Sequence, residues 1–417
     1  MKSRTVLSPV PTQSHPQIGG QMRVLVHWDD ESESDLIGLY LNVDPDRAVV
    51  HTEAEWFLHD AEHRGPWDVV LMTTNRPDHE TALENFQAVR RLLPDCPIVG
   101  ACHQEDLFRI AGFLTHGLRA YVIRDAAGDY MFLLQTTLQN TIDAVRAERE
   151  RLIADRLREE VESVRKLQET IMPHEFPSPT EYQICGRYES SQIRVFGGQP
   201  VVMAGGDYYD VFRIGDDDTV VLLGDASGHG MKACMSIMTM HTLIRMIHDK
   251  VYNNTAAFVA EINKRLYKQT VVNEDGGFIT MLYGSLRSDT HEFQWTSAGH
   301  PLPILQNLET NEVKVMGGID DGGMPLGILP EVDYEWKTLP IPPKSRLMIY
   351  TDGLQEAFPD GDMEHGEFGI PGIFESLKNS AQRPLEEALA ALFDDSLAFT
   401  NGAGRHDDTS VVLIERD

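Results

Sequence analysis

The feature that most constrains the fold is an unbroken helical stretch near the middle of the chain. It runs from about Leu133 to Met172, contains neither glycine nor proline, and is followed by Pro173 and Pro177. About 40 residues is several times the average length of a helix in a globular protein. Since 417 residues also exceed one ordinary core, we expect separate domains before and after this helix.

The apolar positions of this stretch recur mostly at steps of three, four or seven residues, with Arg and Glu between them. The apolar positions are Leu138, Ile142, Val145, Leu152, Leu157, Val161, Val164 and Ile171. The pattern is coiled-coil-like, although its phase slips at Leu152–Ile153. It predicts a linker over residues 131–174 that joins two copies into a homodimer. The alternative is a single amphipathic helix packed on its own domain.

Residues 22–130 alternate short apolar runs with amphipathic stretches. The runs "RVLVHW", "DVVLMT", "CPIVGAC" and "RAYVIR" are typical of buried strands, and "HETALENFQAVRRLL" is typical of a helix. Strands that alternate with helices predict a parallel sheet covered on both faces, a doubly wound α/β domain. Residues 1–21 precede it as a polar tail without the apolar segment of a signal peptide.

Composition excludes several classes of protein. A net charge of −29 opposes general binding to a nucleic-acid backbone, which depends on Lys and Arg. No stretch approaches the ~20 apolar residues of a membrane span. The four cysteines have no zinc-like spacing, so we interpret them as structural thiols of a reducing compartment and expect a cytoplasmic protein.

The third part, residues 175–417, places aspartates beside glycines and strand edges. "VVLLGD" ends at Asp225, "LMIYTD" ends at Asp352, "DDTSVVLI" begins at Asp407, and Asp207 lies in "GGDYYD". Carboxylates that converge from such positions repel one another unless a cation lies between them. Oxygen ligands suit Mg²⁺ or Mn²⁺, so the spacing predicts a metal centre.

Simpler interpretations exist for each motif alone. An Asp-Gly pair is usually a turn. "GGDYYD" departs from the GGDEF signature of diguanylate cyclases at both tyrosines. "GDASGHG" is not a nucleophile elbow, because Asp225 and His229, not glycines, flank Ser227 at two residues.

Together, the motifs resemble the metal-dependent (PPM) Ser/Thr protein phosphatases, and most closely their RsbU/SpoIIE-like bacterial branch. The motifs, in the family's order, are "LQETIMP", "GGDYYDVF", "LLGDASGHGMKA", "TSAGHPLPIL", "MPLGIL", "IYTDGLQEAF" and "DDTSVVLI". The resemblance implies an αββα sandwich over residues 175–417 with two ions, Mn²⁺ or Mg²⁺, at one end of its sheets. It also implies that a metal-activated water, and no protein nucleophile, attacks phosphorus.

Carried over by position, the resemblance implies that Asp225 bridges both ions and that the Ala226 carbonyl completes one shell. Asp207, Asp352 and Asp407 are then the other carboxylate ligands, in preference to Asp408. His229 and His300 lie within the motifs, where a structural role is preferred over that of a proton donor.

The first domain resembles a response-regulator receiver. Asp29 and Asp30 match the acidic pair that binds Mg²⁺ in that family. Alignment on Pro77 puts Thr73 where the phosphate-accepting aspartate belongs, and a hydroxyl cannot form an acyl phosphate. Cys102 replaces the usual Thr or Ser, and Arg124 the usual Lys. We therefore predict a pseudo-receiver; the alternative is an unrelated small α/β domain.

The resulting hypothesis is a signalling phosphatase whose pseudo-receiver and linker regulate the catalytic domain through "RKLQETIMP". The resemblance implies a phosphoserine or phosphothreonine protein as substrate, typically an anti-sigma-factor antagonist of the STAS type, and a sensor or kinase partner at the receiver-like domain. The main alternative is a pseudophosphatase adaptor that binds a partner without catalysis. A DNA-binding response regulator lacks support, since no basic recognition helix is present.

Overall fold

The computed structural model describes residues 22–41, 47–75, 78–125, 127–193, 201–202, 205–228, 230–248, 252, 254–273, 276–359 and 366–417. The chain divides into two compact units, with the boundary between Asp155 and Arg156. The predicted tail over residues 1–21 lies outside the described residues. No helix in the described ranges is both long enough and apolar enough to cross a membrane.

The first unit contains a five-stranded parallel sheet with the order β2-β1-β3-β4-β5. Its strands are β1 (Val24–His27), β2 (Ala48–His51), β3 (Val69–Thr73), β4 (Ile98–His103) and β5 (Ala120–Arg124). This order is the flavodoxin-like arrangement of doubly wound domains. The predicted doubly wound fold is therefore confirmed.

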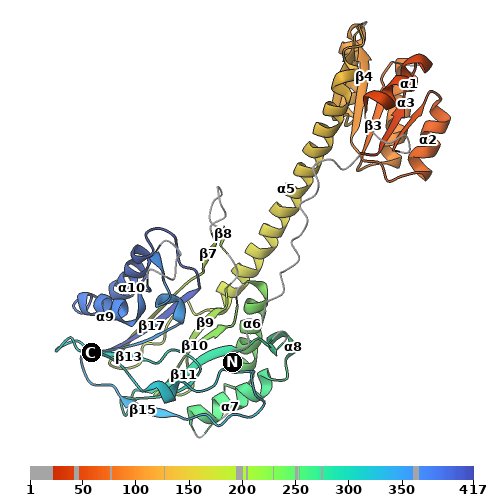
Figure 1. Cartoon of the computed structure of the whole chain (residues 1–417). Coiled ribbons are helices and arrows are strands. Elements are labelled where there is room, and N and C mark those ends of the chain that lie inside the picture. The colour runs from red at the N-terminus through yellow and green to blue at the C-terminus, as the bar shows by residue number, and fades with distance from the viewer. Residues whose placement is uncertain are drawn as a thin grey trace, which may run out of the picture. The chain divides into compact units, whose positions relative to one another are not determined.

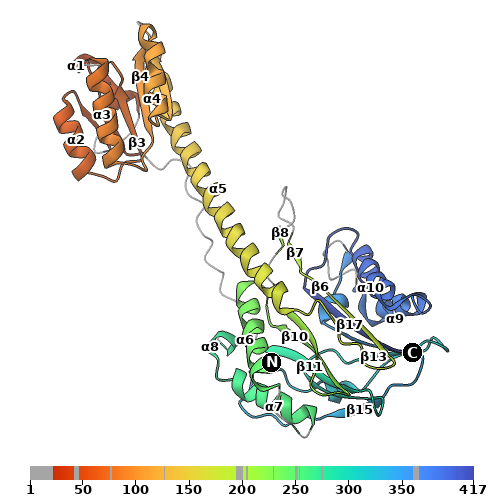
Figure 2. The ribbon, with the colours of Figure 1, turned by 180° about the vertical axis from the view of Figure 1, so that it is seen from behind.

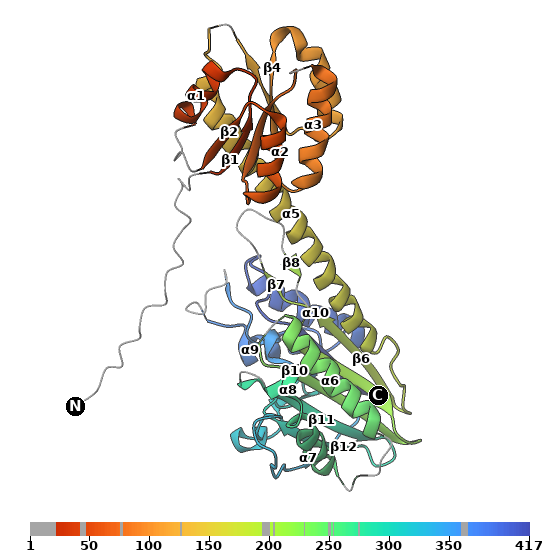
Figure 3. The same ribbon diagram turned by 90° about the vertical axis from the view of Figure 1, so that its right-hand side faces the viewer.

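Helices cover both faces of this sheet (Figure 3). Side chains alternate along each strand, so Val24 and Val26 face one apolar cluster while Leu25 faces another. The first cluster is closed by α1 (Glu31–Tyr40) and the start of α5 (Met131–Ile171); the second is closed by α2 (Ala54–His63), α3 (His79–Leu92) and α4 (Ile110–Thr115). A 3₁₀ helix, η1 (Gln104–Arg109), precedes α4.

Helix α5 is 41 residues long. Leu134, Leu138 and Ile142 bury its first turns in the first unit. Near its other end, Gln168 is buried in the second unit, and Met172 just beyond the helix joins that unit's core. Between these ends Leu152 is 64% exposed and Leu157 is 61% exposed.

The second unit contains two five-stranded antiparallel sheets (Figure 1). One has the order β15-β12-β11-β10-β9 and the other β14-β13-β16-β17-β6. The first is built from β9 (Asp207–Arg213), β10 (Asp218–Ala226), β11 (Ile279–Arg287), β12 (Glu292–Ala298) and β15 (Lys337–Pro340). The second is built from β6 (Tyr182–Glu189), β13 (Ile304–Asn307), β14 (Val313–Val315), β16 (Ser345–Tyr350) and β17 (Thr409–Arg416). A small additional sheet pairs β7 (Gln192–Ile193) with β8 (Val201–Val202).

The two sheets pack face to face between layers of helices, which Figure 2 shows from behind. Leu347 and Ile349 of β16 face the core shared with the other sheet, whereas Met348 and Tyr350 face the outer helices. The helices on the first sheet are α6 (Met231–Ile247), α7 (Thr255–Leu266) and α8 (Thr270–Asn273), and those on the second are α9 (Gly369–Asn379) and α10 (Leu385–Phe399). This is the predicted αββα sandwich.

Candidate metal centre

Two of the predicted ligands lie directly opposite each other in one sheet. Asp207 begins β9, Asp225 is the penultimate residue of β10, and the antiparallel register pairs them. Side chains paired in this way have Cβ atoms about 4.5–5.5 Å apart. Two carboxylates that are far apart in sequence are therefore neighbours at one end of the first sheet.

The second sheet supplies the other acidic residues from loops at the ends of two adjacent strands. Asp352 opens a short 3₁₀ helix, η4 (Asp352–Leu354), two residues after β16, and Asp407 precedes β17. Thr351 joins the two sheets, because its hydroxyl donates to Asp207 Oδ2 at 2.6 Å and its amide donates to Ser410 O at 3.0 Å. The four predicted carboxylates therefore come from both layers of the sandwich.

Electrostatics of these carboxyl groups show that they influence one another. Burial and then repulsion by Asp207, Asp352, Asp407 and Asp408 raise the pKa of Asp225 to about 10. Burial, followed by repulsion from Asp408, raises the pKa of Asp207 well above its ordinary value. Burial and Asp407 likewise raise the pKa of Asp352. A nearby cation reverses this effect, because it favours the ionised form of each carboxyl group.

Asp408 differs from Asp407 in how its oxygens are used. Asp408 Oδ1 accepts from Ser191 N at 2.8 Å, and Asp408 Oδ2 accepts from Gly206 N at 2.6 Å. Asp407 Oδ1 accepts from the amide of Asp408 at 2.8 Å. Because both oxygens of Asp408 bind backbone, this side chain is suited to holding the loops together, which agrees with the preference for Asp407 as a ligand.

Glycines leave the space that the acidic residues need. A Cβ on Gly205 would lie 2.4 Å from Asp408 Oδ2, and one on Gly206 would lie 2.8 Å from the carbonyl oxygen of Ala226. A Cβ on Gly353 would lie 1.9 Å from the backbone oxygen of Asp408. A side chain at any of these three positions would therefore collide with atoms of the acidic residues or of their neighbours.

The residues present fit hard divalent cations in their chemistry. The donor set is entirely carboxylate and carbonyl oxygen, which Mg²⁺ and Mn²⁺ prefer, and its buried carboxyl groups have raised pKa values. Across the described ranges, however, no three His, Cys, Asp or Glu side chains already meet in metal-binding geometry. The carboxylates would have to close around the ions.

The structure describes only one of the two histidines in the motifs. His229 lies outside the described residues. His300 is buried, its Nδ1 lies 2.9 Å from Thr280 Oγ1, and burial lowers its pKa to about 3. An imidazole that stays neutral at pH 7 has no extra proton to donate, so these contacts favour the structural role of His300.

Gln168, near the end of α5, holds the backbone at the metal centre and was not singled out from the sequence. Its side chain is fully buried; Nε2 donates to Asp207 O at 2.9 Å and Oε1 accepts from Gly205 N at 2.9 Å. The motif "LQETIMP" marked the segment, but only the contacts identify the glutamine within it.

A second polar cluster fastens α6 to β9. The Tyr208 hydroxyl donates to Asp210 Oδ2 at 2.6 Å, and Arg245 Nη2 lies 2.6 Å from the same oxygen. His241 Nδ1 lies 2.6 Å from Tyr208 Oη. The second aspartate of "GGDYYD" is therefore part of this network within the first sheet and its helix.

In the receiver-like domain, an arginine fills the acidic pocket. Arg124 lies 2.6 Å from Asp29 Oδ1 and 2.7 Å from Glu33 Oε2, and its guanidinium stacks 4.7 Å from the Trp28 ring centre. Trp28 Nε1 and the Tyr130 hydroxyl also donate to Glu33 Oε2, each at 2.9 Å. The guanidinium thus places a fixed positive charge between the carboxylates.

The other predicted pocket residues have different environments. The carboxylate of Asp30 caps α1 and accepts from the amides of Ser32 and Glu33. Thr73 is buried, and its hydroxyl has no hydrogen-bond partner among the described residues. Cys102 belongs to the apolar cluster on the opposite face of the sheet from Arg124, and burial raises the pKa of its thiol. The structure therefore brings together Asp29 and Arg124 but not Cys102.

Comparison with known families agrees with the fold of the second unit. Residues 215–417 match the family model described as Stage II sporulation protein E (SpoIIE). The match includes Asp225, Asp352 and Asp407 but begins after Asp207, whose place in the site rests on its pairing with Asp225.

Similar proteins cover parts of the chain. IcfG of Synechocystis sp. is 23% identical over 282 residues, which is 62% of this chain and 42% of IcfG. Phosphoserine phosphatase RsbU of Bacillus subtilis is 23% identical over 268 residues, which is 63% of this chain and 72% of RsbU. The SiaA-PP2C domain of Pseudomonas aeruginosa aligns over 65% of this chain and 100% of that domain, with 18% identity and a TM-score of 0.49.

The alignment thus spans less than half the length of IcfG. The family match covers most of the two-sheet architecture but leaves out β6 and β9. Residues 215–417 are therefore similar to the SpoIIE family.

Proposed function

We propose that this chain is a metal-dependent protein serine/threonine phosphatase of bacterial signalling. The observation that carries the proposal is the convergence of buried carboxylates from both sheets, with Asp225 repelled by Asp207, Asp352 and Asp407. Such a cluster relieves its repulsion by taking up protons or by binding cations, and bound cations keep the carboxylates ionised. The match to the SpoIIE family supports the same assignment.

In this proposal, Asp225, Asp207, Asp352, Asp407 and the Ala226 carbonyl hold two Mn²⁺ or Mg²⁺ ions. When bound, such ions lower the pKa of a water and neutralise charge on phosphoryl oxygens. The chain's own contribution is positional: Thr351 and Gln168 fix the side chain and the backbone of Asp207. The glycines at positions 205, 206 and 353 let the backbone approach the acidic residues and their neighbours closely.

The substrate is proposed to be a phosphoserine or phosphothreonine protein, of the class of anti-sigma-factor antagonists with a STAS fold. The support is family resemblance, together with the name phosphoserine phosphatase carried by the relative RsbU. The receiver-like domain, residues 22–130, and the linker, residues 131–174, would regulate the catalytic domain, residues 175–417. Gln168 gives this regulation a physical route, since it links α5 to the backbone of Asp207.

Homodimer formation through α5 belongs to the same proposal. Leu152, Ile153 and Leu157 expose 61–64% of their surface in the middle of the helix. Apolar side chains at such spacing are stable when a second helix covers them. A partner at the receiver-like domain would act without phosphorylating Thr73, because Arg124 already occupies the acidic pocket.

The test is hydrolysis of p-nitrophenyl phosphate with Mn²⁺ by the wild type, Asp225→Asn and Asp352→Asn. Asp217→Asn is the matched control, since this aspartate lies exposed in the β9–β10 turn. We expect turnover that depends on the metal, disappears in both site variants and persists in the control. Absence of turnover in the wild type, on this substrate and on phosphoserine peptides, would instead favour the adaptor.

A further inference from the structure

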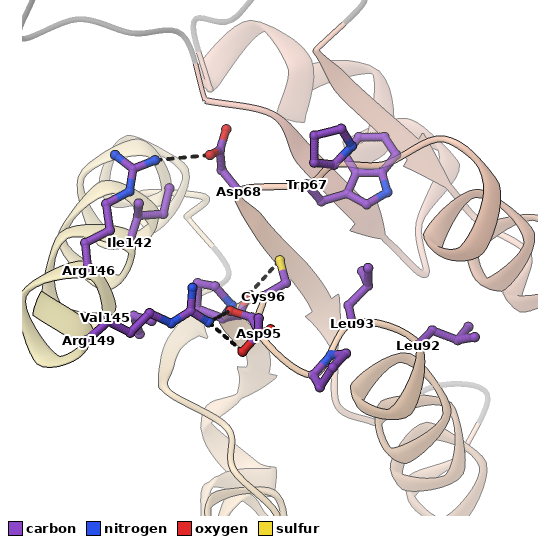
Figure 4. Close-up of a pocket in the computed structure, with 13 residues that line it drawn as sticks. Trp67, Asp68, Leu92, Leu93, Asp95, Cys96, Ile142, Val145, Arg146 and Arg149 are labelled. Atoms are coloured by element: carbon purple, nitrogen blue, oxygen red, sulfur yellow. Dashed lines mark hydrogen bonds and ion pairs between the residues drawn. The ribbon is translucent and has the colours of Figure 1, made fainter. Parts of the chain in front are cut away.

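A cavity of about 410 Å³ lies within the first unit, between α5 and the loops at the amino ends of β3 and β4 (Figure 4). Its walls come from residues 66–68, from residues 92–97, and from one face of α5 between Ile142 and Arg149. Small-molecule sites typically enclose about 300–1,000 Å³. The cavity is therefore large enough for a metabolite-sized ligand.

The floor of this cavity is apolar and uncharged. Trp67, Cys96, Ile142 and Val145 are all at least nine-tenths buried and line it together with Leu93. Burial raises the pKa of the Cys96 thiol to about 12, so the sulfur is a neutral thiol at physiological pH. An apolar body would lose water on entering and gain contact with these side chains.

The rim carries two arginines from α5, both directed at the cavity (Figure 4). Arg146 Nη2 donates to Asp68 Oδ1 at 3.1 Å, and Arg149 Nη2 donates to the backbone and side-chain oxygens of Asp95. In the described part of the chain, the two guanidiniums form no other hydrogen bonds. Each guanidinium uses one nitrogen, Nη2, for these bonds. A guanidinium has five N–H donors, so both arginines keep donors for a ligand.

The two acidic side chains of the rim are each paired with one of these arginines. Asp68 Oδ1 binds Arg146, and Asp68 Oδ2 accepts from the amide of Arg23 at 2.8 Å. Asp95 is mostly exposed, with 88% of its side chain accessible. Donors and acceptors both remain at the rim, but the two arginines are the groups directed at the cavity, and their donors suit an anionic head group.

We propose that this cavity is a binding site for a small organic anion with an apolar body, such as a medium-chain or aromatic carboxylate. The ligand's head group would bind Arg146 and Arg149, and its body would lie on Trp67 and Val145. Because α5 forms one wall and the sheet loops form the other, the bound ligand would hold this part of α5 against the domain. This site is independent of the proposed phosphatase activity and lies at the opposite end of the parallel strands from Asp29 and Arg124.

The experiment is a fluorescence titration of the full chain with 1-anilinonaphthalene-8-sulfonate, an aromatic anion, followed by competition with decanoate, decanol and decylamine. We expect one saturable site per chain, displaced by decanoate better than by the uncharged or cationic analogue. Val145→Trp, which fills the cavity, and the double variant Arg146→Gln/Arg149→Gln should each weaken binding roughly tenfold or more.

The matched control is Arg151→Gln, which removes an exposed arginine on the same helix whose ion pair is with Asp155. This variant should bind like the wild type. Circular dichroism of each variant shows whether the fold is retained, and the double variant tests the site even if Val145→Trp is poorly folded. The proposal is overturned if the wild type shows no saturable binding, if the arginine variant binds equally well, or if decylamine competes as well as decanoate.

Discussion

Gln168→Met is the substitution that most directly tests the link between α5 and the metal centre. Methionine has a similar length and fills the buried space, but it can neither donate to Asp207 O nor accept from Gly205 N, the two bonds that Gln168 makes at 2.9 Å. The substitution leaves two backbone groups without partners in an environment where the side chain is 0% exposed.

Each buried polar group that loses its partner costs about 1–3 kcal/mol. The free energy of unfolding should therefore fall by about 2–6 kcal/mol, with the lower end applying if a water enters. Both groups flank Asp207, so part of this cost should appear in metal binding. For every 1.4 kcal/mol of this cost that is lost from metal binding, the half-saturating Mn²⁺ concentration rises about tenfold.

Two measurements separate these effects: urea denaturation with and without Mn²⁺, and p-nitrophenyl phosphate hydrolysis as a function of Mn²⁺ concentration. Gln139→Met is the control, since Gln139 lies on the same helix and, among the described residues, its side chain bonds to the exposed Asp143. The reasoning is refuted if Gln168→Met changes stability and half-saturating Mn²⁺ no more than the control does.

Four further substitutions test other parts of the structure. Asp225→Asn should abolish metal-dependent turnover. It should also stabilise the metal-free protein at pH 7 by roughly 1–3 kcal/mol, because it removes a buried carboxyl group that its neighbours repel. A melting temperature in EDTA below that of the wild type would contradict this prediction. Gly353→Ala should cost more than about 2 kcal/mol, since its Cβ meets a backbone oxygen at 1.9 Å, whereas Gly318→Ala, with no atom within 4 Å, should stay within about 0.5 kcal/mol in the same thermal melts. Arg124→Met should lower the free energy of unfolding by roughly 2–4 kcal/mol. The loss is smaller than for a fully buried ion pair, because the carboxylate of Glu33 is partly exposed. Denaturation followed by tryptophan fluorescence measures this change, and an unchanged free energy of unfolding would show that the ion cluster does not stabilise the domain. Leu157→Glu should convert a dimer to a monomer in light scattering, and an unchanged mass would argue against association through this part of α5.

Prediction from the sequence succeeded where a pattern repeats along the chain. Short apolar runs located β1, β3, β4 and β5, and an amphipathic period located α3, each to within about two residues of the observed ends. It did not locate β2, because Ala48–His51 is only partly buried and lacks a continuous apolar run. Patterns report burial, and a half-exposed edge strand shows little of it.

Individual contacts at the sites were less predictable. The motifs indicated both Asp407 and Asp408, and only the backbone bonds of Asp408 explain why two adjacent carboxylates would differ in role. Similarly, the sequence showed that Arg124 stands where a receiver has Lys. The contact of Arg124 with Glu33, however, depends on the turn of α1 that brings Glu33 back to the sheet. Such contacts are set by tertiary packing, which no local pattern encodes.

In the proposed regulation, Gln168 is the residue through which α5 would act on the metal centre. Asp225 lies in β10, which is hydrogen-bonded to a strand on each side, whereas Asp207 lies in β9, the edge strand of its sheet. An edge strand has free backbone groups and can be shifted at lower cost than an inner one. β9 is attached to the second sheet through Thr351 and to α5 through Gln168. A movement of α5 would therefore reach Asp207 first and alter its distance from Asp225, so that the helix would change metal affinity without touching the inner strand.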